Sequence, residues 1–500
     1  INPYREDKWD YDWFAIRNAW YFYDKVDMVN DGTPQSYINQ RKAEALGLVA
    51  QRYYEMFKRY GGLPWIDHYI TMGESIDMSR MSITRTVDSI CSLLDRAIAM
   101  PELPERNAVN EFGRVNKVAL RMLKARVLLW SASPLFNPED NQSYYPSFNK
   151  QELIKHETYD KNRWQEAADA CLEAINAAHG AGYALYTKCG DPVKDYKAAV
   201  TEFPDIDANG TAKGNPEIIW GTRPADSYAS ETYQSGSRVT IWSTLKQLRG
   251  TVGTYLIPLQ NMVDKYELRD GSDQPSDYWE TTSDPYNNLD RRFNATIYHH
   301  GYKLGKTVGP FTLDMRMEPA GDQYPAGAQN FTGYYLAKFF DDDYIAGAGN
   351  YPQAFWPYMR LSDLYLMYAE ALNEVDYASN SGEILHYVNL VRNRAGQPNL
   401  EDKPGFQATQ AYVRECIRKE RIVELCYEDQ IYFDYKRWKV GDKYIGGNMY
   451  GMRITGDMAN PTFSKFLYET RVWSSKWYLF PLYQTDVLTT NGVLAQNPGW

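Results

Sequence analysis

Apolar side chains recur every three or four residues in four stretches of the first two hundred positions. This spacing puts the apolar residues on one face of an α-helix, so it predicts four amphipathic helices. The stretches lie at 45–60, 87–98, 115–129 and 164–178. A helix breaker follows each of them, and Gly61-Gly62 and Pro101 end the first two.

The third and fourth stretches alternate alanine with larger apolar residues. Small side chains let antiparallel helices approach closely, as they do in tetratricopeptide (TPR) hairpins. The strict TPR repeat pattern is absent, so we interpret these helices as TPR-like hairpins only.

The helical period is lost between about Lys188 and Pro357. Gly, Pro, Asp and Asn interrupt short apolar runs there. This pattern predicts long loops, short strands such as 217–220 and 295–298, and one helix near 259–266. Loops of this length in a compact protein usually carry function.

The helical period then returns at 361–372, 385–391 and 413–422, and a loop-rich tail follows Lys439. We predict one mainly α unit, in which TPR-like hairpins support an irregular, loop-rich face with a few short strands. Its N-terminal helical part, its loop-rich ligand-face insertion and its C-terminal helices with the tail span 1–187, 188–357 and 358–500.

Composition narrows the choice of partner. The formal net charge of −10 argues against a nucleic-acid partner, because such a surface would not release counterions from phosphate. No apolar stretch is long enough to span a membrane. The chain contains 42 Tyr and 14 Trp, residues that are enriched where a protein holds a partner that stays partly wet.

Signatures of catalysis and metal binding are weak. The chain has no GxSxG or HExxH motif, and its six histidines lack ligand spacing. Asp205, Asp207 and Asn209 match the start of a calcium loop, but Pro216 stands where the closing acid should be. We therefore predict no cofactor, with a polar turn favoured over a calcium site at this loop.

A sequence resemblance begins in the returning helices. Residues 359–374, MRLSDLYLMYAEALNE, resemble the signature helix of the SusD/RagB family of glycan-uptake lipoproteins from Bacteroidetes. Further similar segments follow in the family's order along nearly the whole chain. They lie at 60–65, 132–137, 215–220, 284–293, 388–396, 417–425, 432–438, 480–482 and 496–500.

This resemblance implies a SusD-like fold and binding without catalysis. It implies that the protein captures a glycan outside the cell and delivers it to a SusC-type TonB-dependent transporter of the outer membrane. Family members begin with a signal peptide and a lipidated cysteine. We expect both to lie ahead of Ile1, with the lipid on the cysteine anchoring the protein to the outer membrane.

Charged residues in the matched helices have a structural interpretation of their own. Glu420, Arg421 and Glu424 lie on one helical strip next to apolar residues, so they need charged partners if they are buried. Arg360 and Asp363 have i,i+3 spacing and are expected to pair. We predict that these ions hold helices together and are not a binding site.

A sugar ring offers an apolar C–H face and a fringe of hydroxyls, which suit aromatic rings and polar side chains respectively. Aromatic residues interleaved with polar ones near the start of the chain and in the loop-rich middle are therefore the predicted ligand contacts. They are Arg5, Trp9, Trp13, Tyr228, Tyr233, Arg238, Trp242, Tyr278, Trp279 and Tyr324. Trp9, Trp242 and Trp279 are the principal predicted stacking surfaces.

Three alternatives remain open at this point. Some relatives in the family capture peptides, and the aromatic excess favours sugar over peptide only mildly. A pair of carboxylates could make the protein a glycoside hydrolase, although sequence spacing cannot reveal their separation. A TPR-like scaffold that binds only other proteins is the third alternative.

Overall fold

A computed structural model describes residues 8–202, 205–206, 212–222, 256–304, 311–317, 330–339 and 356–500. Its α-helices are α2 (Trp9–Lys25), α3 (Gln35–Tyr60), α4 (Ile83–Ala99), α5 (Lys117–Ala132), α6 (Asn162–Gly180), α7 (Pro192–Thr201), α10 (Gln260–Val263), α11 (Tyr278–Thr281), α12 (Arg292–Thr296), α13 (Leu361–Arg394), α14 (Gln410–Leu425), α15 (Ile431–Arg437), α16 (Gly441–Tyr444) and α17 (Gln484–Thr489). Short 3-10 helices lie at Val26–Met28, Val109–Glu111, Gln151–Leu153, Leu400–Asp402 and Ser475–Tyr478.

The described strands form antiparallel pairs. They are β1 (Asp205–Ile206) with β2 (Ala212–Lys213), β3 (Ile218–Gly221) with β8 (Pro357–Arg360), β4 (Ile297–Tyr298) with β7 (Tyr335–Leu336), β5 (Lys303–Leu304) with β6 (Phe311–Thr312), and β9 (Gly447–Gly456) with β10 (Pro461–Arg471). The β3–β8 pair joins Ile218 to Arg360, so it leads the chain from the loop-rich middle directly into α13.

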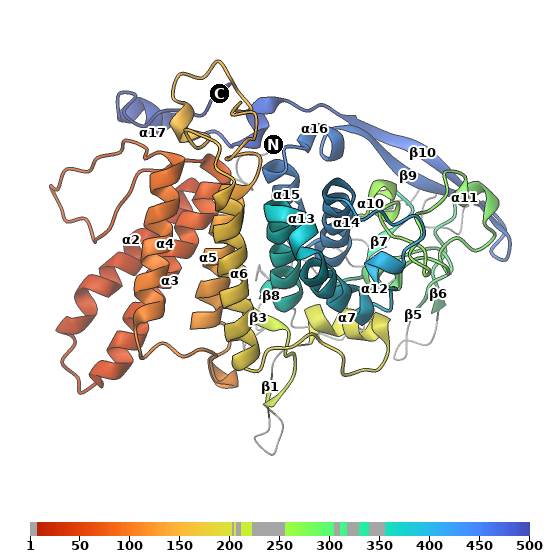
Figure 1. Cartoon of the computed structure of the whole chain (residues 1–500), viewed down its shortest axis with the longest axis horizontal. Coiled ribbons are helices and arrows are strands. Elements are labelled where there is room, and N and C mark those ends of the chain that lie inside the picture. Colours follow the sequence, from red (N-terminus) through yellow and green to blue (C-terminus); the bar gives the residue numbers. More distant parts are fainter. Residues whose placement is uncertain are drawn as a thin grey trace.

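Long helices stack in a row from one side of the molecule to its centre (Figure 1). Helices α2, α3, α4, α5 and α6 each pack against the next, and α6 packs against α13 and then α14. Helices from both ends of the chain therefore form one array, with the loop-rich segments at the far end. The predicted fold, mainly α with TPR-like hairpins and few short strands, is confirmed.

The predicted helix ends are found where the breakers stand. Gly61 caps α3 with φ of +81°, and a Cβ there would lie 2.5 Å from the backbone oxygen of Leu153. The same close approach occurs at Gly62, where a Cβ would lie 2.1 Å from the Met81 oxygen. This Gly pair therefore serves both to end the helix and to let two loops cross it.

The structure has a second hydrophobic core outside the helical array, and tyrosines dominate it. Tyr266, Tyr286, Tyr298 and Tyr334 are fully or almost fully buried there, together with Trp279. The rings of Tyr286 and the neighbouring Phe293 stack at 5.7 Å. Much of the aromatic excess in the loop-rich middle therefore builds a core.

The β9–β10 hairpin and helix α7 are among the elements that were not predicted from the sequence. The long β9–β10 hairpin occupies the tail that was expected to be loop-rich, because few residues of its strands are buried and apolar alternation is weak. Helix α7 lies where the helical period was thought to be lost. Its Asp191 cap accepts a hydrogen bond from the Lys194 amide, and Pro192 occupies its first turn.

Buried ions join the helical array to the loop-rich segments, as predicted for Glu420, Arg421 and Glu424. The prediction that Arg360 pairs with Asp363 is wrong. Arg360 has extended backbone angles ahead of α13, so helical i,i+3 geometry does not apply. Asp363 instead accepts hydrogen bonds from Arg126 (2.7 Å) and Arg421 (2.9 Å).

Arg360 is the centre of a separate buried network. It donates to Glu217 (2.6 Å), Glu424 (2.8 Å) and both carboxylate oxygens of Glu428 (2.7 and 2.8 Å). Glu424 also pairs with Arg394. Burial would raise the pKa of Glu424, but the charges of Arg394 and Arg360 outweigh it and hold that pKa far below its ordinary value.

Among the helices that the structure describes, none combines the length and the apolar character that crossing a membrane requires.

Candidate functional site

Most of the predicted ligand contacts fall outside the described residues. These are Arg5, Tyr228, Tyr233, Arg238, Trp242 and Tyr324. Asp207 and Asn209 of the candidate calcium loop also lie outside, while Asp205 begins strand β1. Within the described part of the chain, no three His, Cys, Asp or Glu residues are grouped to hold a metal ion.

Two of the three predicted stacking tryptophans are core residues, so the expectation that their rings are exposed is wrong. Trp9 is 1% exposed, and its indole N–H donates to Asp486 of α17 (2.8 Å). Trp279 is 2% exposed, contacts Phe463 edge-on and donates to Gln274 (3.1 Å). Both tryptophans stand among polar residues in the sequence, which suggested exposure. Their rings can be buried because Asp486 and Gln274 accept hydrogen bonds from the indole N–H groups.

The two remaining described candidates are not an open platform either. Tyr278 is buried, its hydroxyl donates to the Pro285 carbonyl (2.6 Å), and burial raises its pKa to about 12. Trp13 is half-buried and makes edge-on contacts with Trp9 and Tyr53. The structure therefore does not bring Trp9, Trp13, Tyr278 and Trp279 together on one surface.

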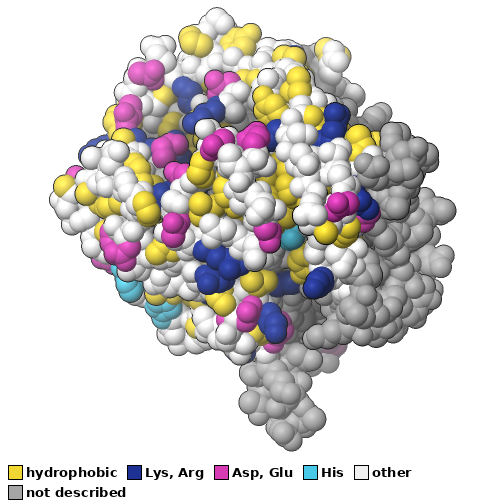
Figure 2. All heavy atoms as spheres, turned by 90° about the vertical axis from the view of Figure 1, so that its right-hand side faces the viewer, with side chains coloured by type: hydrophobic (Ala, Val, Ile, Leu, Met, Phe, Trp, Pro, Cys, Tyr) yellow, Lys and Arg dark blue, Asp and Glu magenta, His cyan; other side chains and the backbone are white. Residues whose placement is uncertain are grey.

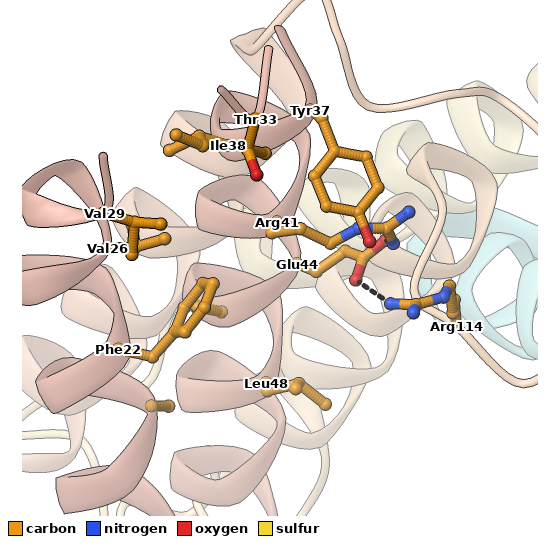
Figure 3. Close-up of a pocket in the computed structure, with 12 residues that line it drawn as sticks. Phe22, Val26, Val29, Thr33, Tyr37, Ile38, Arg41, Glu44, Leu48 and Arg114 are labelled. Atoms are coloured by element: carbon orange, nitrogen blue, oxygen red, sulfur yellow. Dashed lines mark hydrogen bonds and ion pairs between the residues drawn. The ribbon is translucent and has the colours of Figure 1, made fainter. Parts of the chain in front are cut away.

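A pocket of about 460 Å³ opens between α2 and α3 (Figure 3). Phe22, Val26 and Val29 line one side of it and Leu48 lies at its foot. The charges at its rim are mutually paired: Glu44 accepts hydrogen bonds from Arg41 and from Arg114 (3.0 Å). The pocket therefore offers aliphatic surface and few free polar groups, which suits an apolar partner better than sugar hydroxyls.

A second pocket, of about 500 Å³, is rich in acidic residues near α14. Its Glu374 forms an ion pair with Arg414, and Glu415 pairs with Arg418 (2.9 Å). Glu370 is buried there against Arg437, and although burial opposes this, the Arg437 charge lowers its pKa to about 2. These carboxylates are neutralised by arginine.

The third pocket, of about 490 Å³, combines aromatic and polar side chains from distant parts of the chain, and we call it the tyrosine–lysine pocket. Tyr435 of α15 and Tyr444 of α16 stack with centroids 4.8 Å apart and ring planes at 18°. Both rings are half-buried, so part of each reaches the pocket. The aliphatic wall comes from Leu259, Met262 and Met449 among others.

Two lysines lie against the same aromatic ring in the tyrosine–lysine pocket. The ammonium nitrogen of Lys265 is 4.6 Å from the centroid of the Tyr444 ring, and that of Lys443 is 4.9 Å away. Cation–π attraction accounts for each contact. Burial and the nearby charges of Lys419 and Lys443 lower the pKa of Lys265, whereas a hydrogen bond with Tyr444 raises that of Lys443.

The backbone is strained at one wall of this pocket. Tyr427 lines it with φ of +65°, in the left-handed region that side chains with a Cβ avoid. Such a conformation costs roughly 1–3 kcal/mol and persists where surrounding structure imposes it, often at binding sites. Burial also raises the pKa of the Tyr427 hydroxyl well above its usual value.

The loop-rich end of the molecule faces the viewer in Figure 2. Basic, acidic and hydrophobic side chains of the described residues are interspersed over this face. Such a mixed surface suits a partner that remains partly hydrated.

Comparison with known proteins now places the chain. Residues 216–500, which hold the tyrosine–lysine pocket, the β3–β8 pair and the Arg360 network, match the SusD family. The chain belongs to the SusD family.

Individual relatives are distant. A SusD-like protein P2 from Formosa agariphila is 28% identical over 170 residues, which span 33% of this chain and 30% of that relative. A SusD-like protein from Bacteroides fragilis has 24% identity and a TM-score of 0.77, and the match covers 99% of this chain and 86% of that one. A SusD-like carbohydrate binding protein from Bacteroides fragilis has 18% identity and a TM-score of 0.68, over 96% and 83% of the two chains. These two structures share the fold.

The SusD-family segments recognised in the sequence form the scaffold around the pocket. Residues 359–374 open α13, and 432–438 span most of α15. Residues 432–438 were interpreted from the sequence as structural, so Tyr435 was not among the predicted contacts. The segment nevertheless places two aromatic residues beside lysine and arginine. Tyr444, Lys443 and Lys265 were missed because no local pattern brings α10 and α16 together.

Proposed function

We propose that this SusD family member is a non-catalytic protein of the cell surface that captures a glycan and delivers it to a SusC-type transporter. Family membership supports capture, and one structural relative is described as carbohydrate binding. The observation that carries the proposal for this chain is the tyrosine–lysine pocket.

The chemistry of the pocket matches that of a sugar. The stacked pair of Tyr435 and Tyr444 supplies apolar ring surface for the C–H face of a pyranose. Lys265, Lys443 and Arg471 supply hydrogen-bond donors for its oxygens. A pocket of about 490 Å³ has room for one or two sugar units of a longer chain.

The carboxyl groups support binding over hydrolysis. A glycosidase acid needs a raised pKa beside a second carboxylate. Among the described carboxyls with a clear pKa shift, only that of Asp12 is raised, to about 6, because it is buried. Asp12 is fully buried between α2 and α3, where a glycan has no access. Release of new reducing ends from a polysaccharide panel, above a blank without protein, would contradict this part of the proposal.

Capture at this pocket is tested by Tyr444→Ala, with glycan affinity measured by affinity gel and calorimetry. Loss of one stacking surface should weaken binding about tenfold to a hundredfold, by analogy with other aromatic anchors. Tyr11→Ala is the matched control, since Tyr11 is 66% exposed on α2 and far from the pocket in the row of helices. Equal affinities of the two variants would place the glycan elsewhere.

Trp242 is a second proposed contact, from its sequence context beside Arg238. Trp242→Ala should weaken glycan binding while leaving the melting temperature unchanged, because a surface substitution creates no cavity. A large drop in melting temperature with normal affinity would identify Trp242 as a core residue.

Delivery needs a surface for the transporter, and α2 offers one. Its outer face exposes Tyr11 (66%), Phe14 (62%) and Tyr21 (52%), while Trp9 and Ile16 on the opposite face are buried. Exposed aromatic side chains on one helix face are typical of protein interfaces. We propose that this face, with the adjoining apolar pocket between α2 and α3, contacts the SusC-type barrel.

Phe14→Asp should reduce co-purification of the transporter and leave glycan affinity unchanged. The control is Asn162→Asp, which changes an exposed polar residue on another helix, α6.

Anchoring is tested separately by expressing the protein with its native leader in its own host. Recovery of that protein in the soluble fraction would contradict a lipid anchor at the outer membrane.

A further inference from the structure

We propose that the tyrosine–lysine pocket selects an acidic sugar, with the carboxylate or sulfate group of the glycan bound between Lys265 and Lys443 beside the Tyr444 ring. This inference rests on the proposed capture of glycan at the same pocket. It adds the chemical class of the sugar.

The positive charge in the pocket is not balanced by its neighbours. Among the ion pairs between described residues, none involves Lys265 or Lys443. Asp264 lines the same pocket, but its carboxylate pairs with Lys465 at 3.1 Å. Two ammonium groups therefore share one aromatic ring without a carboxylate in contact with either.

The charges around the two lysines are already paired. Glu415, which favours the charged form of both lysines, forms an ion pair with Arg418. Lys419, which adds to the positive potential at Lys265, is itself paired with Asp273. Arg471 at the pocket wall pairs with Glu469 at 2.6 Å. An arriving anion would therefore find Lys265 and Lys443 as the cations without an ion-pair partner.

Contact with the Tyr444 ring alone favours one ammonium group over two, although Lys443 also has a hydrogen bond with Tyr444. A single ammonium over an aromatic ring gains cation–π energy. A second ammonium over the same ring is repelled by the first, and the lowered pKa of Lys265 reflects burial first, then repulsion by Lys419 and by Lys443. A bound anion removes the repulsion and forms charge-assisted hydrogen bonds with both groups.

The net charge of the whole chain makes the local excess significant. At −10, the protein as a whole repels an acidic polysaccharide. An acidic glycan can therefore be held only where cations are concentrated. The tyrosine–lysine pocket meets this condition with a half-buried Lys265 and an exposed Lys443.

The test compares glycans that differ only in charge. Titration calorimetry would use oligogalacturonate against its methyl ester, and a sulfated galactan oligosaccharide against its desulfated form. We expect the charged form in at least one pair to bind about tenfold to a hundredfold more tightly, and this preference to shrink as salt is raised. The pair that shows the preference distinguishes carboxylate from sulfate.

Variants connect the preference to the two lysines. Lys265→Gln and Lys443→Gln should each reduce the preference for the charged form about tenfold, because glutamine keeps a hydrogen-bond donor but removes the charge. Lys124→Gln on α5 is the control, because it changes the net charge equally and removes only a surface pair with Asp95.

The outcomes separate this inference from the proposed function. Equal binding of charged and neutral glycans, or an undiminished preference in both lysine variants, overturns the acidic-sugar inference and leaves glycan capture standing. Failure to bind any glycan in a broad panel overturns both. Normal melting temperatures of the variants exclude loss of folding as the cause.

Discussion

Replacing Arg360 by methionine should destabilise the protein by about 3 kcal/mol, because one side chain neutralises three buried carboxylates. Removing a single partner from a buried ion network costs about 3–5 kcal/mol, since it leaves charge without compensation. Each carboxylate here retains a second cation: Glu217 and Glu424 keep Arg394, and Glu428 keeps Lys338 (2.6 Å). The expected cost therefore lies at the low end of that range.

Equilibrium unfolding in urea, followed by tryptophan fluorescence and circular dichroism, measures this cost. Arg360→Lys should fall between Arg360→Met and the native protein, because lysine keeps the charge but cannot grip both oxygens of Glu428. Arg121→Met is the control: Arg121 lies at the surface and pairs with Glu105 and Glu173, so its loss should cost less than about 1 kcal/mol. If Arg360→Met unfolds at the same urea concentration as Arg121→Met, the buried network does not stabilise the fold.

Three further predictions follow from described contacts. Trp9→Ala should cost about 3–5 kcal/mol of stability and leave glycan affinity unchanged in a paired melting and titration experiment, because the ring is in the core. Trp279→Ala should behave in the same way, and a native melting temperature in either variant would refute its core assignment. His156 is buried between Ser131 and Thr84, and burial lowers its pKa to about 3. The unfolded chain therefore binds a proton at this histidine below about pH 6.5, whereas the folded protein does not bind it until the pH is much lower. The free energy of unfolding should fall by roughly 1.4 kcal/mol per pH unit as the pH drops from 6.5 towards 3. His156→Gln should remove that component of the slope in urea titrations at several pH values, and an unchanged slope would contradict it.

The helical array could be predicted because its signals are local. Helices α3 to α6 each carry their own apolar period, and a breaker such as Gly61 or Pro101 follows within a few residues. The β9–β10 hairpin escaped prediction because its stability comes from pairing between strands, and Met452, Ile454 and Phe463 are its few contributions to the second core. A short window of sequence contains only one of the two strands, so it does not show the pairing.

The candidate site was harder to predict for a related physical reason. The expectation that an aromatic residue in a loop-rich segment is exposed failed for Trp279, because that segment builds an aromatic core of its own. The tyrosine–lysine pocket depends on bringing Lys265 beside Tyr444, which are far apart in the chain. The sequence led to aromatic and charged candidates, but no local pattern indicates the long-range pairing that forms the tyrosine–lysine pocket.

The hydrogen bond between Trp9 and Asp486 joins two helices at opposite ends of the chain, α2 and α17. A mechanical load applied between α2 and α17 is carried directly by this contact. The force then passes from α2 to α17 without crossing the β3–β8 pair or the tyrosine–lysine pocket. A load of this kind can therefore break the contact between α2 and α17 without distorting the β3–β8 pair or the tyrosine–lysine pocket.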